Sequence, residues 1–214
     1  MTEAINPLIS TIIPTYRRPV LLRRAIASAL EQRGVDVRVC VFDNCSGDET
    51  AEVVHGMAQE HVRIRYHCHA HNIGGGANFD FAMRSVDTPF FSLLSDDDYL
   101  LPGFYQRALA ALAENPEAMF WVGETLCVDE RGAIWDARVN SWSREGVFNP
   151  PEGLMAMMHG RAPTWTGVFS PISISEESAR RSTAWAPACV TASASSGRSS
   201  RPKIALNGAF GWDS

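Results

Sequence analysis

Hydrophobic residues recur in two alternating patterns along roughly the first 130 residues of the chain. In some segments every second side chain is hydrophobic, as at Val37, Val39 and Val41, and this spacing predicts strands. In others the spacing is helical, as at Leu22 and Ile26. In chain order, the patterns predict strands at residues 9–14, 37–43, 62–68, 89–95 and 118–129, and helices at 19–32, 46–60, 75–86 and 102–115.

The order of these elements favours an α/β fold. Four strand–helix units in succession are typical of a parallel, doubly wound sheet, and right-handed crossovers place its helices on both faces. Residues 89–95 are almost continuously hydrophobic, which is typical of a strand in the middle of such a sheet. Ser46 and Asp48 are candidate N-caps for the second helix. We therefore expect a doubly wound, mostly parallel sheet with helices on both faces.

The pattern changes after residue 130. We expect an antiparallel strand at residues 133–139, a short Met-rich helix at 150–160 and a last strand at 163–170. Residues 170–214 contain 11 Ser and 8 Ala among 45 residues, but only six Val, Ile, Leu, Met or Phe. So few large apolar side chains do not offset the entropy of ordering the chain. We expect an irregular, loosely packed tail whose sequence is either truncated or altered.

Composition and charge narrow the classes of function. The chain has 214 residues, of which 45% are hydrophobic and 20% charged, as in an ordinary globular domain. Its net charge of −5 gives no overall electrostatic attraction to nucleic acid. We find no signal peptide and no run of roughly 18 apolar residues, so we expect no membrane span. The five cysteines are odd in number and widely spaced, which favours free thiols in the cytoplasm.

The most specific feature is the acidic run SDDD at residues 95–98, at the end of the hydrophobic run. Open α/β sheets bind ligands at the carboxyl ends of their strands. Three adjacent carboxylates repel one another and are costly to desolvate. A divalent cation such as Mg²⁺ or Mn²⁺ relieves this cost because it prefers carboxylate oxygen. The alternative is a solvated turn that caps the helix beginning near Pro102.

Three more loops follow the first three predicted strands. After the first, Tyr16 offers a ring for stacking on a base and Arg18 a guanidinium for phosphate; the alternative is an exposed loop. After the second, Asp43 can accept hydrogen bonds from a base imide or a ribose hydroxyl, or form an Asx-turn. After the third, the glycines of residues 72–78 allow a ligand to approach the backbone at a helix N-terminus.

These four loops meet at one edge of the expected sheet, and as a set they resemble the family 2 glycosyltransferases, which have the GT-A fold. The segments are IIPTYRRP, VFDNCSGDET, HNIGGGANFDFAM and LLSDDDYLLPG, in the family's order over roughly residues 8–130. The resemblance implies a GT-A-like nucleotide-sugar-binding domain at residues 1–169. Within it, residues 8–130 form the nucleotide-binding half and 131–169 begin the acceptor half, and the tail at 170–214 follows.

The resemblance also implies roles for individual residues. The loop after the first strand would line the base pocket, and Asp43 would hydrogen-bond the base, usually uracil. Asp96 would reach the ribose or support the metal, and Asp97 would bind the metal at the diphosphate. Ser95 stands where many members have the first Asp of a D-x-D motif. The full candidate set is Pro14, Thr15, Tyr16, Arg18, Asp43, Asn72, Gly74, Asn78 and Asp96 for the nucleotide, with Asp97 and Asp98 for the metal.

The implied activity is metal-dependent, inverting transfer of a sugar from a nucleotide-diphosphate sugar of the UDP type to an acceptor hydroxyl. The resemblance further implies Mn²⁺ or Mg²⁺ as cofactor, a saccharide or lipid-linked acceptor, and no nucleic-acid partner. It places the protein in cell-envelope polysaccharide biosynthesis, in the cytoplasm and peripheral to the inner face of the membrane.

Family members carry a later acidic residue that serves as catalytic base. Here the corresponding stretch contains only Glu176, Glu177 and Asp213, none in a recognisable setting, so the base is unassigned. A catalytically inactive nucleotide-sugar-binding domain is therefore the alternative. A nucleotidyltransferase or dehydrogenase is disfavoured because the first loop is not glycine-rich.

Three groups of residues have competing interpretations. The His/Cys-rich stretch at 67–71 is either a transition-metal site or, as we favour, a strand end leading into the nucleotide loop. Arg23 and Arg24 are expected on the solvated face of the first helix. Four tryptophans are expected in the core, although they could instead form a platform on which the acceptor sugar stacks. They are Trp121, Trp135, Trp142 and Trp165.

Overall fold

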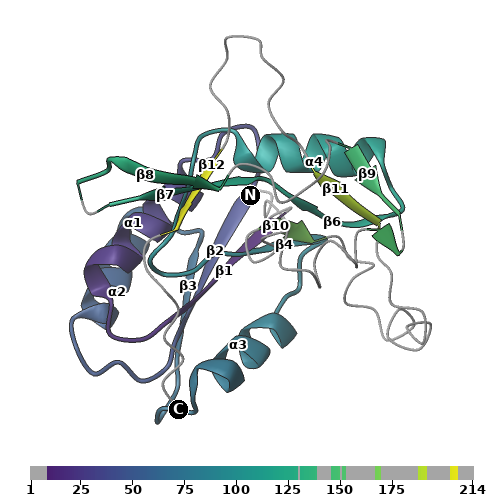
Figure 1. Cartoon of the computed structure of the whole chain (residues 1–214). Helices are drawn as coiled ribbons and strands as arrows, with labels where there is room; N and C mark the ends of the chain where they lie inside the picture. Colours follow the sequence, from purple (N-terminus) through teal and green to yellow (C-terminus); the bar gives the residue numbers. More distant parts are fainter. Residues whose placement is uncertain are drawn as a thin grey trace.

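The structure is a computed structural model that describes residues 9–129, 131–138, 146–149, 151–152, 167–169, 188–191 and 203–206 (Figure 1). The helices are α1 (Pro19–Leu30), α2 (Thr50–Glu60), α3 (Gly75–Arg84) and α4 (Phe104–Glu114). The strands before α4 are β1 (Ile9–Thr15), β2 (Val37–Asp43), β3 (Ile64–Cys68), β4 (Phe90–Leu93) and β5 (Tyr99–Leu100). Those after it are β6 (Ala118–Val122), β7 (Glu124–Val128), β8 (Ile134–Arg138), β9 (Gly146–Phe148), β10 (Gly167–Phe169), β11 (Ala188–Thr191) and β12 (Lys203–Leu206).

Parallel pairing of the first four strands builds the half of the molecule that carries the candidate site. β3, β2, β1 and β4 lie side by side in that order, and all run parallel. β1 and β2 stay in register from Ile9 opposite Val37 to Thr15 opposite Asp43, so two predicted site residues end neighbouring strands together. α1 and α2 pack on one face and α3 on the other (Figure 1). The predicted doubly wound, mostly parallel sheet is confirmed.

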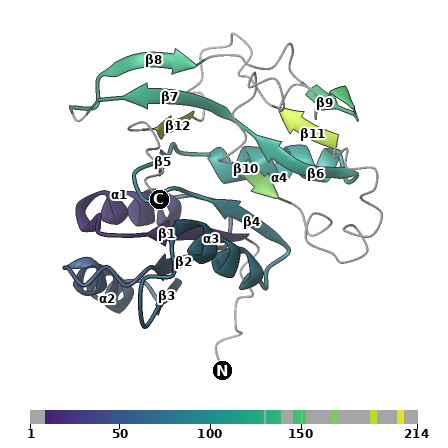
Figure 2. The ribbon, with the colours of Figure 1, turned by 60° about the horizontal axis from the view of Figure 1, so that its bottom comes forward.

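The remaining strands extend this sheet and add a second one. β10 lies antiparallel between β4 and β6, and β11 and β9 follow beyond β6. The second sheet has the order β5-β12-β7-β8, and Figure 2 shows α1 between this sheet and β1. The antiparallel strand predicted at residues 133–139 is confirmed as β8, which pairs with β7.

The single strand predicted at residues 118–129 is wrong, because β6 and β7 belong to different sheets. Gly123 lies between them, and a Cβ atom there would come within 2.8 Å of the Phe104 ring and 3.1 Å of the Trp121 ring. The chain passes these rings only because residue 123 has no side chain. The hydrophobic pattern continues across the break and therefore does not reveal it.

The second helix begins later than predicted. Ser46 is not its N-cap, because the Ser46 hydroxyl instead donates to Asp43 Oδ1 at 2.6 Å. Asp48 Oδ1 accepts hydrogen bonds from the backbone N and the Oγ1 of Thr50, at 3.0 and 2.5 Å, and the bond from the Thr50 hydroxyl lowers the pKa of Asp48. Asp48 thus supports the first turn of α2, although Glu49 is the N-cap residue.

Two segments of the Ser/Ala-rich tail are regular. β11 pairs with β6 and β9, and β12 pairs with β7 and β5. The prediction of an irregular tail is therefore wrong for these two segments. The strand predicted at residues 163–170 is present as β10, but β11 and β12 follow it. Strands of only four residues leave little periodicity to detect. The helix predicted at 150–160 falls outside the described residues except for 151–152, and the domain boundary after residue 169 stays a prediction.

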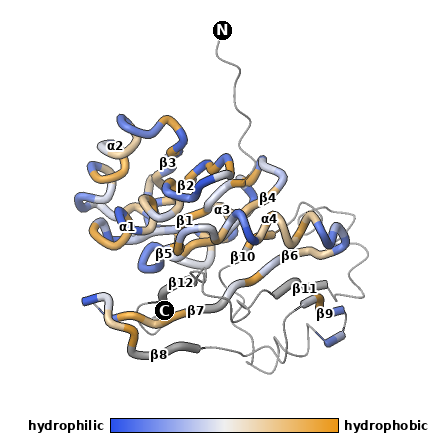
Figure 3. The backbone as a smooth tube through the Cα atoms, turned by 90° about the horizontal axis from the view of Figure 1, so that it is seen from above, coloured by the Kyte–Doolittle hydropathy of each residue, from blue (hydrophilic) through white to orange (hydrophobic). Residues whose placement is uncertain are grey.

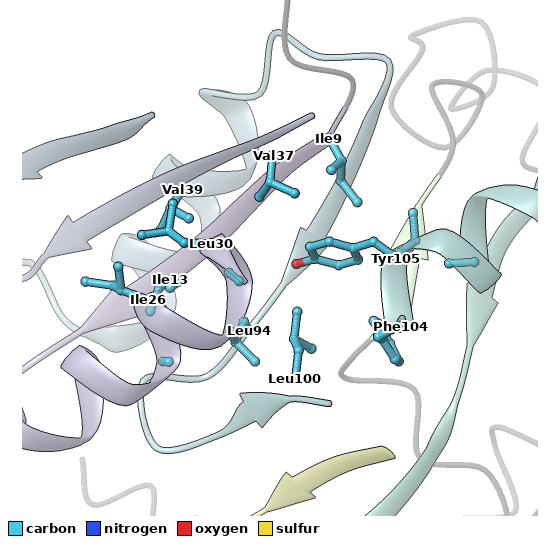
Figure 4. Close-up of a cluster of buried hydrophobic side chains, with 14 of the residues drawn as sticks. Ile9, Ile13, Ile26, Leu30, Val37, Val39, Leu94, Leu100, Phe104 and Tyr105 are labelled. Atoms are coloured by element: carbon cyan, nitrogen blue, oxygen red, sulfur yellow. The ribbon is translucent and has the colours of Figure 1, made fainter. Parts of the chain in front are cut away.

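A continuous core lies between the parallel strands and the helices α1, α2 and α4. Figure 3 shows hydrophobic residues along β1, whereas hydrophilic and hydrophobic residues alternate along the helices. Figure 4 shows Ile9 and Val37 close to Tyr105, which comes from α4. The Tyr105 hydroxyl shares a 2.6 Å hydrogen bond with Thr11 Oγ1, and burial raises the pKa of Tyr105 to about 12. Trp121 is 0% exposed, which confirms its expected place in the core.

Several other expectations concern particular side chains. Cys40, Cys45, Cys68 and Cys127 are free thiols, as predicted. The side chains of Cys189, Trp135, Trp142 and Trp165 fall outside the part of the chain that the structure describes. Among the described helices, none combines the length and the apolar character needed to cross a bilayer.

We expect Gly123→Ala to lower the free energy of unfolding by about 1–3 kcal/mol, because the new methyl group overpacks the Phe104 ring. Urea denaturation measures the change. Gly56→Ala is the control: Gly56 is exposed in the middle of α2, and a Cβ atom added there would meet nothing within 4 Å, so this variant should gain about 0.5–1 kcal/mol. Equal stability of Gly123→Ala and the wild type would show that the backbone can move away from the ring.

Candidate functional site

The acidic segment after β4 is bonded to the loop after β1. Asp96 is 6% exposed, and its Oδ2 accepts a hydrogen bond from Thr15 Oγ1 at 2.7 Å. Arg18 Nη1 lies 3.2 Å from Asp96 Oδ1 and 2.7 Å from Asp97 Oδ2. Burial raises the pKa of Asp96, while the Thr15 hydrogen bond and the Arg18 charge act in the opposite direction. Four of the predicted site residues therefore meet at one edge of the sheet.

The first helix also reaches this segment. Arg24 Nη2 donates to the backbone carbonyl of Asp97 at 2.8 Å, and its guanidinium lies over the Tyr99 ring, 4.7 Å from the centroid. The expected solvated position is therefore wrong for Arg24, whereas Arg23 is exposed. The helical pattern did not reveal this contact because it depends on β5, which has two residues and is too short for pattern analysis.

Asp43 ends β2 and is 2% exposed. Its Oδ1 accepts hydrogen bonds from the backbone N and the Oγ of Ser46, at 2.9 and 2.6 Å, and its Oδ2 accepts one from the Tyr66 hydroxyl at 2.6 Å. Burial, followed by the bond to Asp43, raises the pKa of Tyr66, so the phenol remains a donor. An ionised carboxylate offers about four acceptor positions, so these three bonds leave one, which the neighbouring Cys68 thiol and a ligand can share. Sequence reasoning found Asp43 but missed Tyr66 on β3.

Asparagine side chains connect the second and third loops. Asn44 Nδ2 donates to Asn72 Oδ1 at 2.9 Å, and Asn44 Oδ1 accepts from the backbone N of Ile73 at 2.8 Å. Asn72 Oδ1 also accepts from the backbone N of Gly74 at 2.8 Å. Asn72 and Gly74, both predicted to shape the nucleotide wall, are exposed in the same loop. Asn44 holds that loop against the end of β2, a role that the sequence did not reveal.

Asn78, another predicted wall residue, is only 2% exposed. Its Nδ2 donates to the Phe42 carbonyl at 2.9 Å, and its Oδ1 lies 3.0 Å from His69 Nε2. His67 stacks on Phe81 with ring centroids 4.7 Å apart. Within the described ranges, no group of three or more His, Cys, Asp or Glu is placed to hold a metal, so the transition-metal interpretation of this stretch gains no support. The histidines instead join the end of β3 to α3.

The first loop presents Tyr16 at the surface. Pro14, in β1, is half-buried, whereas Tyr16 is 40% exposed with the Arg17 guanidinium 5.0 Å from its ring centroid. Arg17 has a left-handed backbone with a φ of 57°, which is costly for a residue with a side chain. Ser46 holds it there: its Oγ accepts from the Arg17 backbone N at 2.9 Å, and its carbonyl accepts from Arg17 Nε at 3.0 Å.

The geometry of Asp96 and Asp97 fits one divalent cation. One oxygen from each carboxylate already converges on a single cationic nitrogen, Arg18 Nη1. Mg²⁺ is commonly held by one or two carboxylates, with waters and substrate phosphates as its other ligands. Asp98 is 1% exposed, and its role as a ligand stays a prediction.

Comparison with known proteins gives a family match. The model described as glycosyl transferase family 2 matches residues 10–170. The GalNAc(5)-diNAcBac-PP-undecaprenol beta-1,3-glucosyltransferase of Campylobacter jejuni subsp. jejuni is 35% identical over 155 residues, which cover 72% of this chain and 50% of that protein. The Escherichia coli chondroitin synthase is 32% identical over 103 residues, which cover 48% of this chain and 15% of that protein. The chain thus spans half or less of the length of these relatives.

Solved structures share the fold. S. aureus TarS 1-349 in complex with UDP-GlcNAc matches 94% of this chain with a TM-score of 0.69 and 16% identity, over 59% of its own chain. The mannosyltransferase PcManGT from Pyrobaculum calidifontis, in complex with GDP-Man and Mn2+, matches 60% of this chain with a TM-score of 0.50 and 20% identity, over 37% of its own chain. The predicted GT-A-like fold is confirmed.

We expect Tyr66→Phe to lower the free energy of unfolding by about 1–3 kcal/mol, because buried Asp43 loses one of its donors. Tyr16→Phe removes the same hydroxyl from an exposed ring and should change stability by about 0.5 kcal/mol at most. Urea denaturation at pH 7 compares the two variants. If both variants lose the same small free energy of unfolding, the hydrogen bond from Tyr66 to Asp43 does not stabilise the protein.

Proposed function

The chain belongs to glycosyltransferase family 2, and on that premise we propose that it transfers a sugar from a UDP-type nucleotide-diphosphate sugar to an acceptor hydroxyl. The observation that carries the proposal is the meeting of four loops at one sheet edge. There, Tyr16 follows β1, Asp43 ends β2, Asn44 in the next loop bonds to Asn72 after β3, and Asp96 and Asp97 follow β4. This edge is where open α/β sheets bind ligands.

The donor's nucleotide would bind across the first three loops. Tyr16 would stack on the base, and the remaining acceptor position of Asp43 would take the imide N–H of uracil. Pro14 and Thr15 would complete the base pocket, and the loop braced by Asn44 would form the wall beside it. The UDP-GlcNAc complex of TarS supports this choice of donor class.

Asp96 and Asp97 would hold a divalent cation, Mn²⁺ or Mg²⁺, next to the donor's diphosphate. When bound, such a cation neutralises the charge that develops on the departing diphosphate. The Mn2+ complex of PcManGT supports a cation in this fold. Asp96 would also contact the ribose, and its bond to Thr15 supports this role because it holds Asp96 beside the proposed base pocket.

The name of one relative supports the acceptor class and the stereochemistry that we propose. The Campylobacter relative is named for an undecaprenol-linked substrate and a β-1,3 product. A β-linked product from an α-linked UDP-sugar requires inversion at the anomeric carbon. We therefore propose inverting transfer to a saccharide or lipid-linked acceptor in envelope polysaccharide synthesis, at the cytoplasmic face of the membrane.

One observation favours a second candidate, a domain that binds the donor without turnover. An inverting transfer needs a base for the acceptor proton. After the last predicted strand the sequence has only three acidic residues, Glu176, Glu177 and Asp213, and none stands in a recognisable setting for that role. Release of UDP from UDP-GlcNAc or UDP-glucose, measured with saccharide and undecaprenol-linked acceptors, separates the candidates. Donor binding without acceptor-dependent UDP release would establish the second.

We expect Asp97→Asn to weaken UDP binding in the presence of Mn²⁺ by about tenfold or more, and to make binding without Mn²⁺ no weaker. The reason is that Asp97 supplies one of the two convergent carboxylate oxygens. Calorimetric titration with UDP measures both affinities. The matched control is Asp80→Asn, which removes the same charge from an exposed pair with Arg84 on α3. Unchanged Mn²⁺ dependence in Asp97→Asn would exclude Asp97 as a ligand.

We expect Asp43→Asn to weaken UDP binding by about tenfold both with and without Mn²⁺, because an imide donor loses its charged acceptor. The control is Asp48→Asn in the same loop, whose carboxylate bonds to Thr50 at the start of α2. Thermal unfolding of both variants shows whether each remains folded. Equal UDP affinities for these two folded variants would remove Asp43 from the base pocket.

A further inference from the structure

The two carboxylates at the sheet edge are oriented by hydroxyl groups. Thr15 Oγ1 donates to Asp96 Oδ2 at 2.7 Å, and Ser95 Oγ donates to Asp97 Oδ1 at 2.7 Å. The remaining oxygen of each carboxylate converges on one nitrogen, Arg18 Nη1, at 3.2 and 2.7 Å. Two neutral hydroxyl groups therefore orient the carboxylates, and the positively charged guanidinium of Arg18 lies where their other two oxygens converge.

We propose that Arg18 is an exchangeable counter-ion: its guanidinium neutralises Asp96 and Asp97 in the donor-free protein, and on cation binding it leaves them for the donor's diphosphate. This inference rests on the proposed function. It also assigns a role to Ser95, which stands where many family members have an aspartate. Here the Ser95 hydroxyl positions the Asp97 carboxylate.

The cation and the guanidinium cannot occupy this position together. Mg²⁺ binds carboxylate oxygen at about 2.0–2.1 Å and Nη1 lies 2.7 Å from Asp97 Oδ2, so a cation shared by the same two oxygens would lie less than about 5 Å from Nη1. Two positive centres at that distance repel strongly in a partly buried site. Since the Asp96 side chain is 8% exposed and the Asp97 side chain 14%, water screens them poorly.

Arg18 is free to leave, whereas its neighbour Arg24 is not. The Arg18 side chain is 49% exposed, and an ion pair with so exposed a partner is weak. Arg24 is fixed by its bond to the Asp97 carbonyl and by the Tyr99 ring beneath its guanidinium. Arg24 thus holds the backbone of the acidic segment, whereas Arg18 neutralises part of its charge.

Charge explains why the exchange favours donor binding. Asp96, Asp97 and Arg18 together carry a net charge of −1, which repels a diphosphate. A divalent cation at the carboxylates changes this local charge to +1 and releases a guanidinium, which is suited to bidentate contact with phosphate oxygens. Cation and donor would therefore bind cooperatively.

Manganese EPR on the full chain without nucleotide tests the exchange. We expect Arg18→Gln to bind Mn²⁺ at least fivefold more tightly than the wild type, because the competing cation is gone. Arg23→Gln is the matched control: Arg23 is exposed on α1, so the substitution removes the same charge from a nearby position outside the site. Equal or weaker Mn²⁺ binding by Arg18→Gln relative to Arg23→Gln, or no binding by either, overturns the exchange.

Calorimetric titration with UDP in saturating Mn²⁺ tests the second half of the proposal. Arg18→Gln should bind UDP about tenfold more weakly than Arg23→Gln, and equal affinities would show that Arg18 does not move to the diphosphate. The two proposals fail in different ways. If the wild type binds UDP with Mn²⁺ but Arg18→Gln gains no Mn²⁺ affinity, only the exchange is wrong. If Arg18→Gln gains Mn²⁺ affinity but no protein binds UDP, the exchange at the carboxylates stands and the proposed nucleotide site is wrong.

Discussion

The hydrogen bond from the Thr15 hydroxyl to Asp96 connects the end of β1 to the segment after β4, and the rest of the site depends on it. A carboxylate that is 6% exposed must be compensated by donors, or its charge is lost to protonation. Thr15 supplies one donor from the strand next to β4, and its backbone carbonyl accepts from Asn44 on the loop after β2. One residue at the end of a central strand therefore holds loops from three strands together. This arrangement is possible because β2, β1 and β4 are parallel neighbours whose ends coincide.

The same parallel arrangement explains why so much of the site was predictable. Each candidate loop directly follows a strand with a clear hydrophobic pattern, alternating or continuous, so its position in space follows from topology alone. Thr15, Asp43 and Asp96 end or follow β1, β2 and β4 as the pattern requires. The four parallel strands and four helices of residues 9–115 needed only the local periodicity of each element and the handedness of the crossovers. The resemblance of the loop sequences then added chemistry to positions that the periodicity had already fixed.

What the sequence did not reveal depends on contacts between distant elements. Tyr66 bonds to Asp43 across neighbouring strands, and Arg24 reaches the acidic segment through β5. Neither contact leaves a periodic signal, because each depends on how far one side chain extends beyond its own element. The break at Gly123 has a related origin: the Phe104 ring, from α4, and the Trp121 ring, two residues earlier in β6, exclude a side chain there. Local patterns predict elements, whereas packing between elements decides these details.

The larger sheet also joins the two predicted halves, although they are separate in the sequence: the nucleotide-binding half at residues 8–130 and the acceptor half at 131–169. β4 carries the acidic segment at its end, and its second neighbour is β10, which comes from residues 167–169. Phe169 of β10 stacks on Phe91 of β4 with centroids 4.8 Å apart, and lies 5.5 Å from Phe120 of β6. The strand before the candidate metal-binding aspartates is thus packed against the beginning of the predicted acceptor half. The proposed glycosyl transfer needs the donor's anomeric carbon and the acceptor hydroxyl at one point, and a shared central strand would hold the two predicted halves in a fixed relative position for it.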